Sequence, residues 1–411
     1  MCSSDLKADH AGPEQRQRPF HGVPFTIKEN IDLVGTPTTQ GLAAFADTLP
    51  ARNAPIVDRM LAAGAIPLGR TNLPEMGARL DTDNPLRGRT YNPWNRDLTP
   101  GGSSGGEAAA LATGMTPFGL GNDIGGSLRN PAYCCGIAAL KPSIGRVPCV
   151  SSIDPVDMGV SGAFLTDGPM ARSVADLRVG LSVLAGRHIE DPQSVDVPLE
   201  GRQPEFPRAA LVTEIAGYEI PAAIRREIER AGLILEGQGW VVEQVEAPEL
   251  ERVYEIWGKI LMGGSDLEGV ADAAVKPETL AYLQRLQSVF DIQSLTLDEA
   301  LVERRRLRRL WSAFLTDYTV AIGPTWATLP WPIDTDLDPD KGVDAVRNSW
   351  PFIVPGNALG LPSVALPTGI AGELPTGIQV YAELYRDDLC LWASELIEME
   401  SQCPTPINPV G

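Results

Sequence analysis

The chain has 411 residues with a formal net charge of −19, and 43% of its residues are hydrophobic. This composition is typical of a globular protein with enough apolar side chains to bury a large core. So acidic a surface repels phosphate backbones, which argues against a nucleic-acid partner. The sequence contains no apolar run of roughly 18 residues or more, so it predicts no membrane span. The polar N-terminus lacks the apolar segment of a secretion signal.

Strand-like and helix-like segments alternate in the first half of the chain. We interpret Asn53 as the cap of the first long helix and Gly64 as its end. The alternation favours an α/β sheet with helices on its faces. The expected elements are strands at Val23–Lys28, Ala65–Leu68 and Phe118–Leu120, and helices at Ala54–Ala63, Gly105–Thr113 and Ser173–Leu184.

The second half is richer in helical patterns. Pro221–Gln238 is amphipathic, with apolar residues near helical spacing. The basic run Arg304–Arg309 is interpreted as a solvated helix face rather than an anion site, and Trp331–Lys341 as a loop. Neither a repeat nor a low-complexity linker divides the chain. The expected elements are helices at Lys276–Val289, Leu297–Thr316 and Asp387–Glu400, and strands at Val241–Val245, Thr319–Ile322, Ser363–Leu366 and Ile378–Ala382.

Chemistry-bearing residues are densest between Gly101 and Arg129, where two loops are rich in glycine and serine. Glycines let backbone N–H groups approach a ligand closely, and successive N–H groups form a nest for an anion such as an oxyanion. Neither loop carries the lysine of a phosphate-binding P-loop, and neither has a dinucleotide-binding pattern after a strand. Alternatively, the glycines only form tight turns and bind no ligand. The presence of two such loops at this spacing makes that interpretation the weaker one.

A serine nucleophile in the second loop, Ser127, would need a base. The three histidines are His10, His21 and His188, and His21 has the surroundings of a turn residue. A serine–histidine–aspartate triad is therefore open but poorly supported. Lys28 follows the apolar run Val-Pro-Phe-Thr-Ile, so it is either a buried amine or a surface charge at a strand end.

The segments Val23–Asn30, Gly101–Gly106 and Asp123–Arg129 resemble the amidase signature family in order and spacing. The motifs Lys141–Arg146, Gly168–Ser173 and Leu374–Gln379 extend the resemblance over nearly the whole chain. It implies one large domain, residues 1–411, in which a mixed central β-sheet is surrounded by α-helices.

The resemblance also assigns roles to individual residues. It implies that Ser127 is the nucleophile, that Ser103, held by a cis peptide from Gly102, is the bridging serine, and that Lys28 is the base. It implies neither a metal nor a cofactor, and the six cysteines form no Cys-x-x-Cys pair that would suggest zinc. The oxyanion hole would consist of the backbone N–H groups of Ile124, Gly125, Gly126 and Ser127, and the loops would be braced by Ser104, Asp123 and Arg129.

The resemblance leaves three functions open. They are a free-standing amidase for a small amide substrate, a glutaminase-type subunit of a tRNA-dependent amidotransferase, and an inactive homologue. We expect a cytoplasmic protein, with a homodimer as one assembly. Few residues precede Lys28, and Leu6–Ala11 resembles the end of a helix that starts earlier in the family.

The family's acyl pocket is formed by variable segments, here within Ile153–Thr166 and Val253–Trp350. Candidate lining residues are Met76, Trp257 and Trp326, although such residues more often belong to a core.

Overall fold

The chain is described by a computed structural model that covers residues 12–151, 161–263, 275–290 and 295–401. A ten-stranded sheet runs through the molecule, and a two-stranded hairpin, β3 (Asp83–Asn84) and β4 (Gly88–Arg89), lies apart from it. The strands of the large sheet are β1 (Pro24–Lys28), β2 (Ile66–Thr71), β5 (Phe118–Asp123), β6 (Ala138–Lys141), β7 (Thr166–Ala171), β8 (Arg208–Leu211), β9 (Val241–Gln244), β10 (Val320–Pro324), β11 (Ser363–Ala371) and β12 (Leu374–Tyr381).

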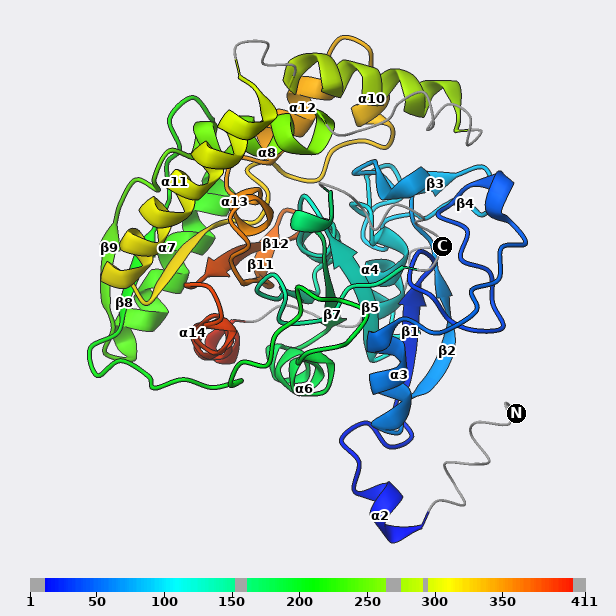
Figure 1. Ribbon diagram of the computed structural model, residues 1–411. Coiled ribbons are helices and arrows are strands. Elements are labelled where there is room, and N and C mark those ends of the chain that lie inside the picture. Colours follow the sequence, from blue (N-terminus) through cyan, green and yellow to red (C-terminus); the bar gives the residue numbers. More distant parts are fainter. Residues whose placement is uncertain (1–11, 152–160, 264–274, 291–294, 402–411) are drawn as a thin grey trace.

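Helices surround this sheet, as Figure 1 shows. They are α2 (Pro13–Arg16), α3 (Pro55–Ala62), α4 (Gly105–Ala112), α5 (Arg129–Cys135), α6 (Val174–Leu184), α7 (Ala222–Gly237), α8 (Leu250–Gly263), α10 (Pro277–Phe290), α11 (Leu297–Asp317), α12 (Gly342–Ser349), α13 (Pro355–Ala358) and α14 (Asp387–Glu400). None of the helices in the described ranges is long and apolar enough to cross a membrane.

The sheet is mixed, with the order β2-β1-β5-β7-β6-β11-β12-β10-β8-β9. Strand pairs near the two edges are parallel, such as β1 with β2 and β5, whereas the central pairs are antiparallel. Neighbouring side chains on β5 point to opposite faces. Phe118 lies against Gly180 of α6, and Gly119 lies against Glu107 of α4. Helices therefore cover both faces, and the predicted α/β fold class is confirmed.

Helices with a strong pattern lie close to where the sequence predicts them. The apolar positions of α7, namely Ile224, Ile228, Ala231 and Leu235, are all buried. The side chain of Ser173 caps α6 by accepting a hydrogen bond from the N–H of Asp176. This bond satisfies a backbone donor that has no partner within the helix.

Other predictions are wrong in detail. The cap of α3 is Ala54, not Asn53, because Pro55 occupies the first helical position and Asn53 bonds to Asp58 instead. The strand predicted at Ala65–Leu68 runs from Ile66 to Thr71. Several elements were not predicted at all: α5, β6, β7, β8, α8, α12 and α13. Most of them are short, but α8 has 14 residues, with charged Glu251, Glu255 and Lys259 between buried apolar positions, so its helical period could have been read from the sequence.

The interpretation of Arg304–Arg309 as a solvated helix face is wrong for its first residue. Arg304 is half-buried, donates to the carbonyl oxygen of Ala358 (2.6 Å), and lies 4.7 Å from the ring centre of Phe164. Burial lowers the pKa of its guanidinium to about 10. Six consecutive helical residues span more than one turn, so the run necessarily turns some side chains inward, as it does with the buried Leu307.

The segment predicted as a loop, Trp331–Lys341, contacts the first half of the chain through Asp336 and Arg79. Its short 3₁₀ helix, Thr335–Leu337, brings Asp336 into the interior. Arg79 is also buried, and its guanidinium donates to both carboxylate oxygens of Asp336 at 3.1 and 2.8 Å. A buried pair of this kind stabilises the fold only while both partners are present.

Replacing Arg79 with leucine should leave the Asp336 carboxyl buried without its cation. We expect the free energy of unfolding to fall by about 3–5 kcal/mol, measured by urea denaturation. Arg226→Leu on the exposed side of α7 is the control, and it should change stability by no more than about 0.5 kcal/mol. Equal denaturation midpoints for the two variants would show that the buried pair is not needed.

Candidate active site

Three strand ends bring polar residues together at one edge of the sheet. Lys28 is the last residue of β1, and Asn122 is the penultimate residue of the parallel neighbour β5. The antiparallel strand β7 places Asp167 opposite Asn122. Because parallel strands end on the same side of a sheet, the fold itself gathers these side chains.

The amine of Lys28 is fully buried and has two oxygen partners. Its Nζ donates to Oγ of Ser103 at 2.6 Å and to Oδ1 of Asn122 at 2.7 Å. Burial lowers the pKa of Lys28 to about 7, against the opposing charges of Asp123, Asp167 and Glu107. A substantial fraction of this amine is therefore neutral at physiological pH, unlike a surface lysine.

Two carboxyl groups near this amine have altered ionisation as well. Burial raises the pKa of Glu107 to about 7, although Thr26 and Thr71 donate hydrogen bonds to it. Burial also raises the pKa of Asp167 to about 7, against a hydrogen bond from Asn122. Since both groups carry only part of a negative charge near neutral pH, they do not hold Lys28 in its charged form.

A pair of asparagines fixes the acceptor of Lys28. Asn30 Nδ2 donates to Asn122 Oδ1 at 3.3 Å, and Asn122 Nδ2 donates back to Asn30 Oδ1 at 3.1 Å. This reciprocal pair keeps the amide oxygen of Asn122, rather than its NH₂ group, towards Lys28. Neither asparagine was singled out from the sequence, although Asn30 and Asn122 lie within or beside the quoted motifs.

The two serines lie on neighbouring loops. The Gly102–Ser103 peptide is cis, as the family resemblance implies, and both Ser103 and Ser127 are buried. The loops are joined by the Ser104 N–H, which donates to the carbonyl oxygen of Ser127 at 3.2 Å. Among the described residues, no hydrogen bond joins Oγ of Ser127 to Oγ of Ser103, so of the side-chain contacts that the family resemblance implies, only that between Lys28 and Ser103 is present.

Asn130, which was not predicted as a site residue, holds the peptide before Ser103. The Asn130 side chain accepts the N–H of Gly102 at 2.9 Å and donates to the Gly102 carbonyl oxygen at 2.5 Å. The first loop is thus fixed by a residue of the helix that follows the second loop.

Carbonyl groups of the second loop are fixed one by one. The Asp123 carbonyl oxygen accepts a hydrogen bond from Asn357 Nδ2 at 3.0 Å, and the Ile124 carbonyl oxygen accepts one from Trp257 Nε1 at 3.0 Å. The Gly126 carbonyl oxygen accepts the N–H of Asn130 at 2.7 Å. These bonds hold the peptide planes of the loop.

The N–H groups of this loop differ in availability. The N–H of Gly126 donates to Oδ1 of Asp123 at 2.6 Å, so it is already engaged. The N–H groups of Gly125 and Ser127 have no hydrogen-bond partner within the described part of the chain. In a trans peptide the N–H points opposite to the carbonyl group, so these two donors face away from the groups that fix Ile124 and Gly126.

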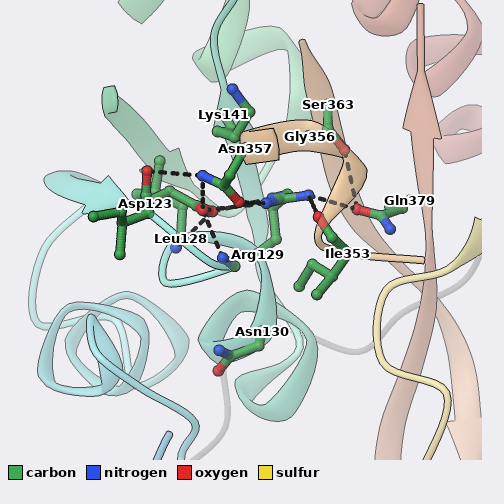
Figure 2. Close-up of polar contacts among 12 residues, drawn as sticks. Asp123, Leu128, Arg129, Asn130, Lys141, Ile353, Gly356, Asn357, Ser363 and Gln379 are labelled. Carbon is green, nitrogen blue, oxygen red and sulfur yellow. Dashed lines mark hydrogen bonds and ion pairs between the residues drawn. The ribbon is translucent and has the colours of Figure 1, made fainter. Parts of the chain in front are cut away.

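An ion pair braces the loop from behind. Figure 2 shows Arg129 between the Asp123 carboxylate and the carbonyl group of Ile353, with Asn357 bridging Arg129 and Asp123. Arg129 donates to Asp123 at 3.0 and 3.1 Å. Burial alone would raise the pKa of Asp123, but the charge of Arg129 outweighs it and holds that pKa well below its usual range. Asp123 is therefore a permanent anion.

The candidate lining residues divide into two groups. Met76 is 40% exposed, and the following residue, Gly77, lies against the Ser103 side chain. Trp257 and Trp326 are both buried in the hydrophobic core. The first part of the predicted pocket, up to residue 160, lies outside the described residues, as does the segment Leu6–Ala11.

The histidines in the described ranges lie in turns. His21 precedes β1, whereas Lys28 ends it, so the length of the strand separates them. His188 lies in the turn after α6, where its Nδ1 accepts the N–H of Glu190 at 3.3 Å.

The mixed sheet of this α/β fold brings a buried amine to Ser103, and the loop of Ser103 is bonded to the loop of Ser127, which is an arrangement expected of an amidase. The chain belongs to the amidase signature family, because the sequence profile described as Amidase matches residues 3–391. The prediction of an amide-hydrolysing enzyme is thereby confirmed.

Individual relatives agree with this assignment. The indoleacetamide hydrolase of Bradyrhizobium diazoefficiens is 36% identical over 411 residues, covering 97% of this chain and 78% of that protein. An acylamidase of Rhodococcus erythropolis is 31% identical, covering 91% of this chain and 80% of that protein. A glutamyl-tRNA(Gln) amidotransferase component of Thermus thermophilus is 32% identical, covering 92% of this chain and 85% of that protein.

Solved structures show the same fold. The structure of 6-aminohexanoate cyclic dimer hydrolase is similar to this chain with a TM-score of 0.85 at 25% identity, covering 98% of this chain and 89% of that one.

The lowered pKa of Lys28 has a consequence for stability. In the unfolded chain this lysine has an ordinary pKa of about 10.4, so between about pH 7 and pH 10 the unfolded state binds more protons than the folded state. Relative to Lys28→Met, the wild-type protein should therefore gain stability as the pH rises, by up to about 1.4 kcal/mol per pH unit. Urea denaturation of both proteins across this range tests it, and parallel curves would contradict a neutral amine.

Proposed function

We propose that the chain hydrolyses a carboxylic amide through an acyl-enzyme on Ser127, with Ser103 and Lys28 as a proton relay. The observation that carries this proposal is the 2.6 Å contact between the buried Lys28 amine and Ser103 Oγ, together with the lowering of the Lys28 pKa to about 7. A base acts best when its pKa lies near the working pH.

In the first step, Ser127 Oγ attacks the amide carbonyl carbon. Its proton passes to Ser103 Oγ as the proton of Ser103 passes to Lys28 Nζ. The negative charge that develops on the carbonyl oxygen is stabilised by backbone N–H donors of Ile124, Gly125 and Ser127. Gly126 was expected among these donors, but its N–H is engaged by Asp123, and we propose that it supports the loop instead.

In the second step, the C–N bond breaks and the relay runs in reverse, so that the proton on Lys28 reaches the leaving nitrogen. Water then adds to the ester carbon of acylated Ser127 and gives a proton to Lys28 through Ser103. The C–O bond to Ser127 breaks as that proton returns to Ser127 Oγ. The products are a carboxylate and ammonia or an amine.

Asn122 helps to orient the base. A neutral amine has two N–H bonds and one lone pair. When Asn122 Oδ1 accepts one N–H of the neutral Lys28 amine, as the 2.7 Å contact indicates, the lone pair of the amine can accept the proton of the Ser103 hydroxyl across the same 2.6 Å contact through which the charged amine donates. The reciprocal bonds with Asn30 prevent the Asn122 amide from turning its NH₂ group towards Lys28.

A primary arylacetamide is the first substrate to test, because one relative is named an indoleacetamide hydrolase. Glutamine with an amidotransferase partner is the alternative, because another relative is named as part of such an enzyme. We propose Met76 as a substrate contact, because it is exposed and precedes Gly77, which lies against the Ser103 side chain. A cytoplasmic location and a homodimer also stay predictions. A screen of aryl, aliphatic and glutaminyl amides, with the purified chain alone, separates the two functions.

Removing the Ser127 hydroxyl should abolish the reaction. We expect that Ser127→Ala folds normally, hydrolyses no amide and is not labelled by a fluorophosphonate, because no acyl or phosphonyl adduct can form. Mass spectrometry of the labelled wild type should place the adduct on Ser127. Turnover of the alanine variant at the wild-type rate would exclude the mechanism.

The base can be identified from the pH dependence of acylation. The rate should rise with pH around pH 7, as Lys28 loses its proton. Lys28→Ala should lower the rate by about 10²–10⁴-fold, and Lys28→Arg should not restore it, because a guanidinium stays protonated.

His21→Asn is the matched control for this series, because His21 precedes the same strand that Lys28 ends. It should keep the wild-type rate and pH profile. A folded His21 variant without activity, beside an active Lys28→Ala variant, would replace the relay with a serine–histidine mechanism.

A further inference from the structure

We infer that Trp257 is a positioning residue that sets the direction of an oxyanion-binding N–H group, that of Gly125. Trp257 lies on α8, far from the glycine-rich loop in sequence, and does not belong to the proposed relay. The inference rests on the proposed function, because it gives the loop after β5 the role of an oxyanion hole. Its test is therefore arranged so that the two can fail separately.

The geometry of one peptide group carries the inference. The indole Nε1–H of Trp257 donates to the carbonyl oxygen of Ile124 at 3.0 Å. The same peptide group contains the N–H of Gly125, and in a trans peptide these two groups point in opposite directions. Fixing the carbonyl oxygen on the α8 side therefore directs the Gly125 N–H away from α8.

The Trp257 ring restricts the same peptide by contact. A Cβ atom at Gly125 would lie 2.7 Å from Cζ2 of Trp257, so the indole covers this face of the glycine. Glycine peptides rotate easily, since they lack a side chain. The hydrogen bond and the ring contact together leave the Ile124–Gly125 peptide little freedom to turn its carbonyl group towards Ser127.

The indole is itself held firmly. Its ring packs edge-on against Trp350 at 5.1 Å and against Phe290 at 6.0 Å between ring centres, and it stacks on Tyr254 at 6.5 Å. Only 3% of Trp257 is exposed. A donor packed this way is pre-organised, which is the condition for effective oxyanion stabilisation in the loop it supports.

Packing alone does not account for the hydrogen bond. The buried indole N–H groups of Trp326, Trp331 and Trp350 have no hydrogen-bond partner within the described residues. This core therefore tolerates tryptophans whose N–H is unused. The N–H of Trp257 instead donates to the Ile124 carbonyl group, in the loop that carries Ser127. The same peptide contains the N–H of Gly125, which has no hydrogen-bond partner among the described residues.

Trp257→Phe tests the inference, because it removes the N–H but keeps an aromatic ring. Trp94→Phe is a closely matched control. Trp94 donates its Nε1–H to the carbonyl oxygen of Cys135 at 2.9 Å, and its Cζ2 lies 3.3 Å from the Cβ position of Gly136. The two variants therefore lose the same kind of bond over the same kind of glycine, one at the oxyanion loop and one at the end of α5.

We expect Trp257→Phe to lower kcat for the wild type's best amide, and its fluorophosphonate labelling rate, by about 10–100-fold. This is less than the roughly 10²–10³-fold cost of deleting an oxyanion donor outright. KM should change less than about threefold, because ground-state binding does not need the donor. The pH profile should be unchanged, because Lys28 is untouched. Trp94→Phe should keep kcat within about twofold. Its urea midpoint should change no more than that of Trp257→Phe, because Trp94 is half-buried and Trp257 is buried.

The outcomes separate the two claims. Equal kcat losses in both variants, or a loss in Trp257→Phe that appears only in KM, would overturn the role of Trp257 and leave the proposed relay intact. Full activity of Ser127→Ala would instead overturn the proposed function itself. A kcat loss confined to Trp257→Phe, at unchanged pH profile, supports the inference.

Discussion

The burial of one amine at the end of β1 is the constraint on which the rest of this site depends. A charged ammonium without exposure to water is costly, so the surroundings of Lys28 must favour its neutral form. Burial itself favours the neutral form and lowers the pKa of Lys28, against the charges of nearby carboxyl groups. Glu107 and Asp167 oppose it less than full anions would, because burial raises their own pKa values to about 7, while Ser103 and Asn122 serve as hydrogen-bond partners of the amine. The neighbouring strands β5 and β7 supply Asn122 and Asp167, because the strand ends meet at one edge of the sheet.

The role that we propose for the glycine-rich loop adds a second constraint, because donors for a developing negative charge must be fixed before the charge appears. Here the loop's carbonyl groups bind residues that come from elsewhere, such as Asn357 and Trp257. The permanent ion pair of Asp123 and Arg129 holds the base of the loop. The site thus combines a buried amine of lowered pKa with a loop whose carbonyl groups are fixed by hydrogen bonds.

Local patterns in the sequence are enough to predict part of this. Helical spacing gives the buried face of α7, and the motifs around Lys28, Ser103 and Ser127 give the residues that the fold gathers. Sequence patterns do not give Asn357, which meets Asp123 across 234 positions, or the inward turn of Arg304. The spacing of apolar residues indicates which face of a helix is buried. It does not indicate which residues that face contacts, because this depends on how elements distant in sequence pack together. The cap of α3 was missed for a local reason, because proline takes the first helical position.

The residues that hold the glycine-rich loop lie far from it in sequence, so the loop can be fixed only late during synthesis of the chain. A ribosome releases Ser127 long before Trp257, Asn357 or the strand β12 exists, and domains acquire their packing only when their elements are complete. Until then the nascent serine has neither a fixed donor nor a closed sheet beside it. The nucleophilic reactivity that we propose for Ser127 is therefore expected only in the finished fold, so an incomplete chain should not become acylated at this serine.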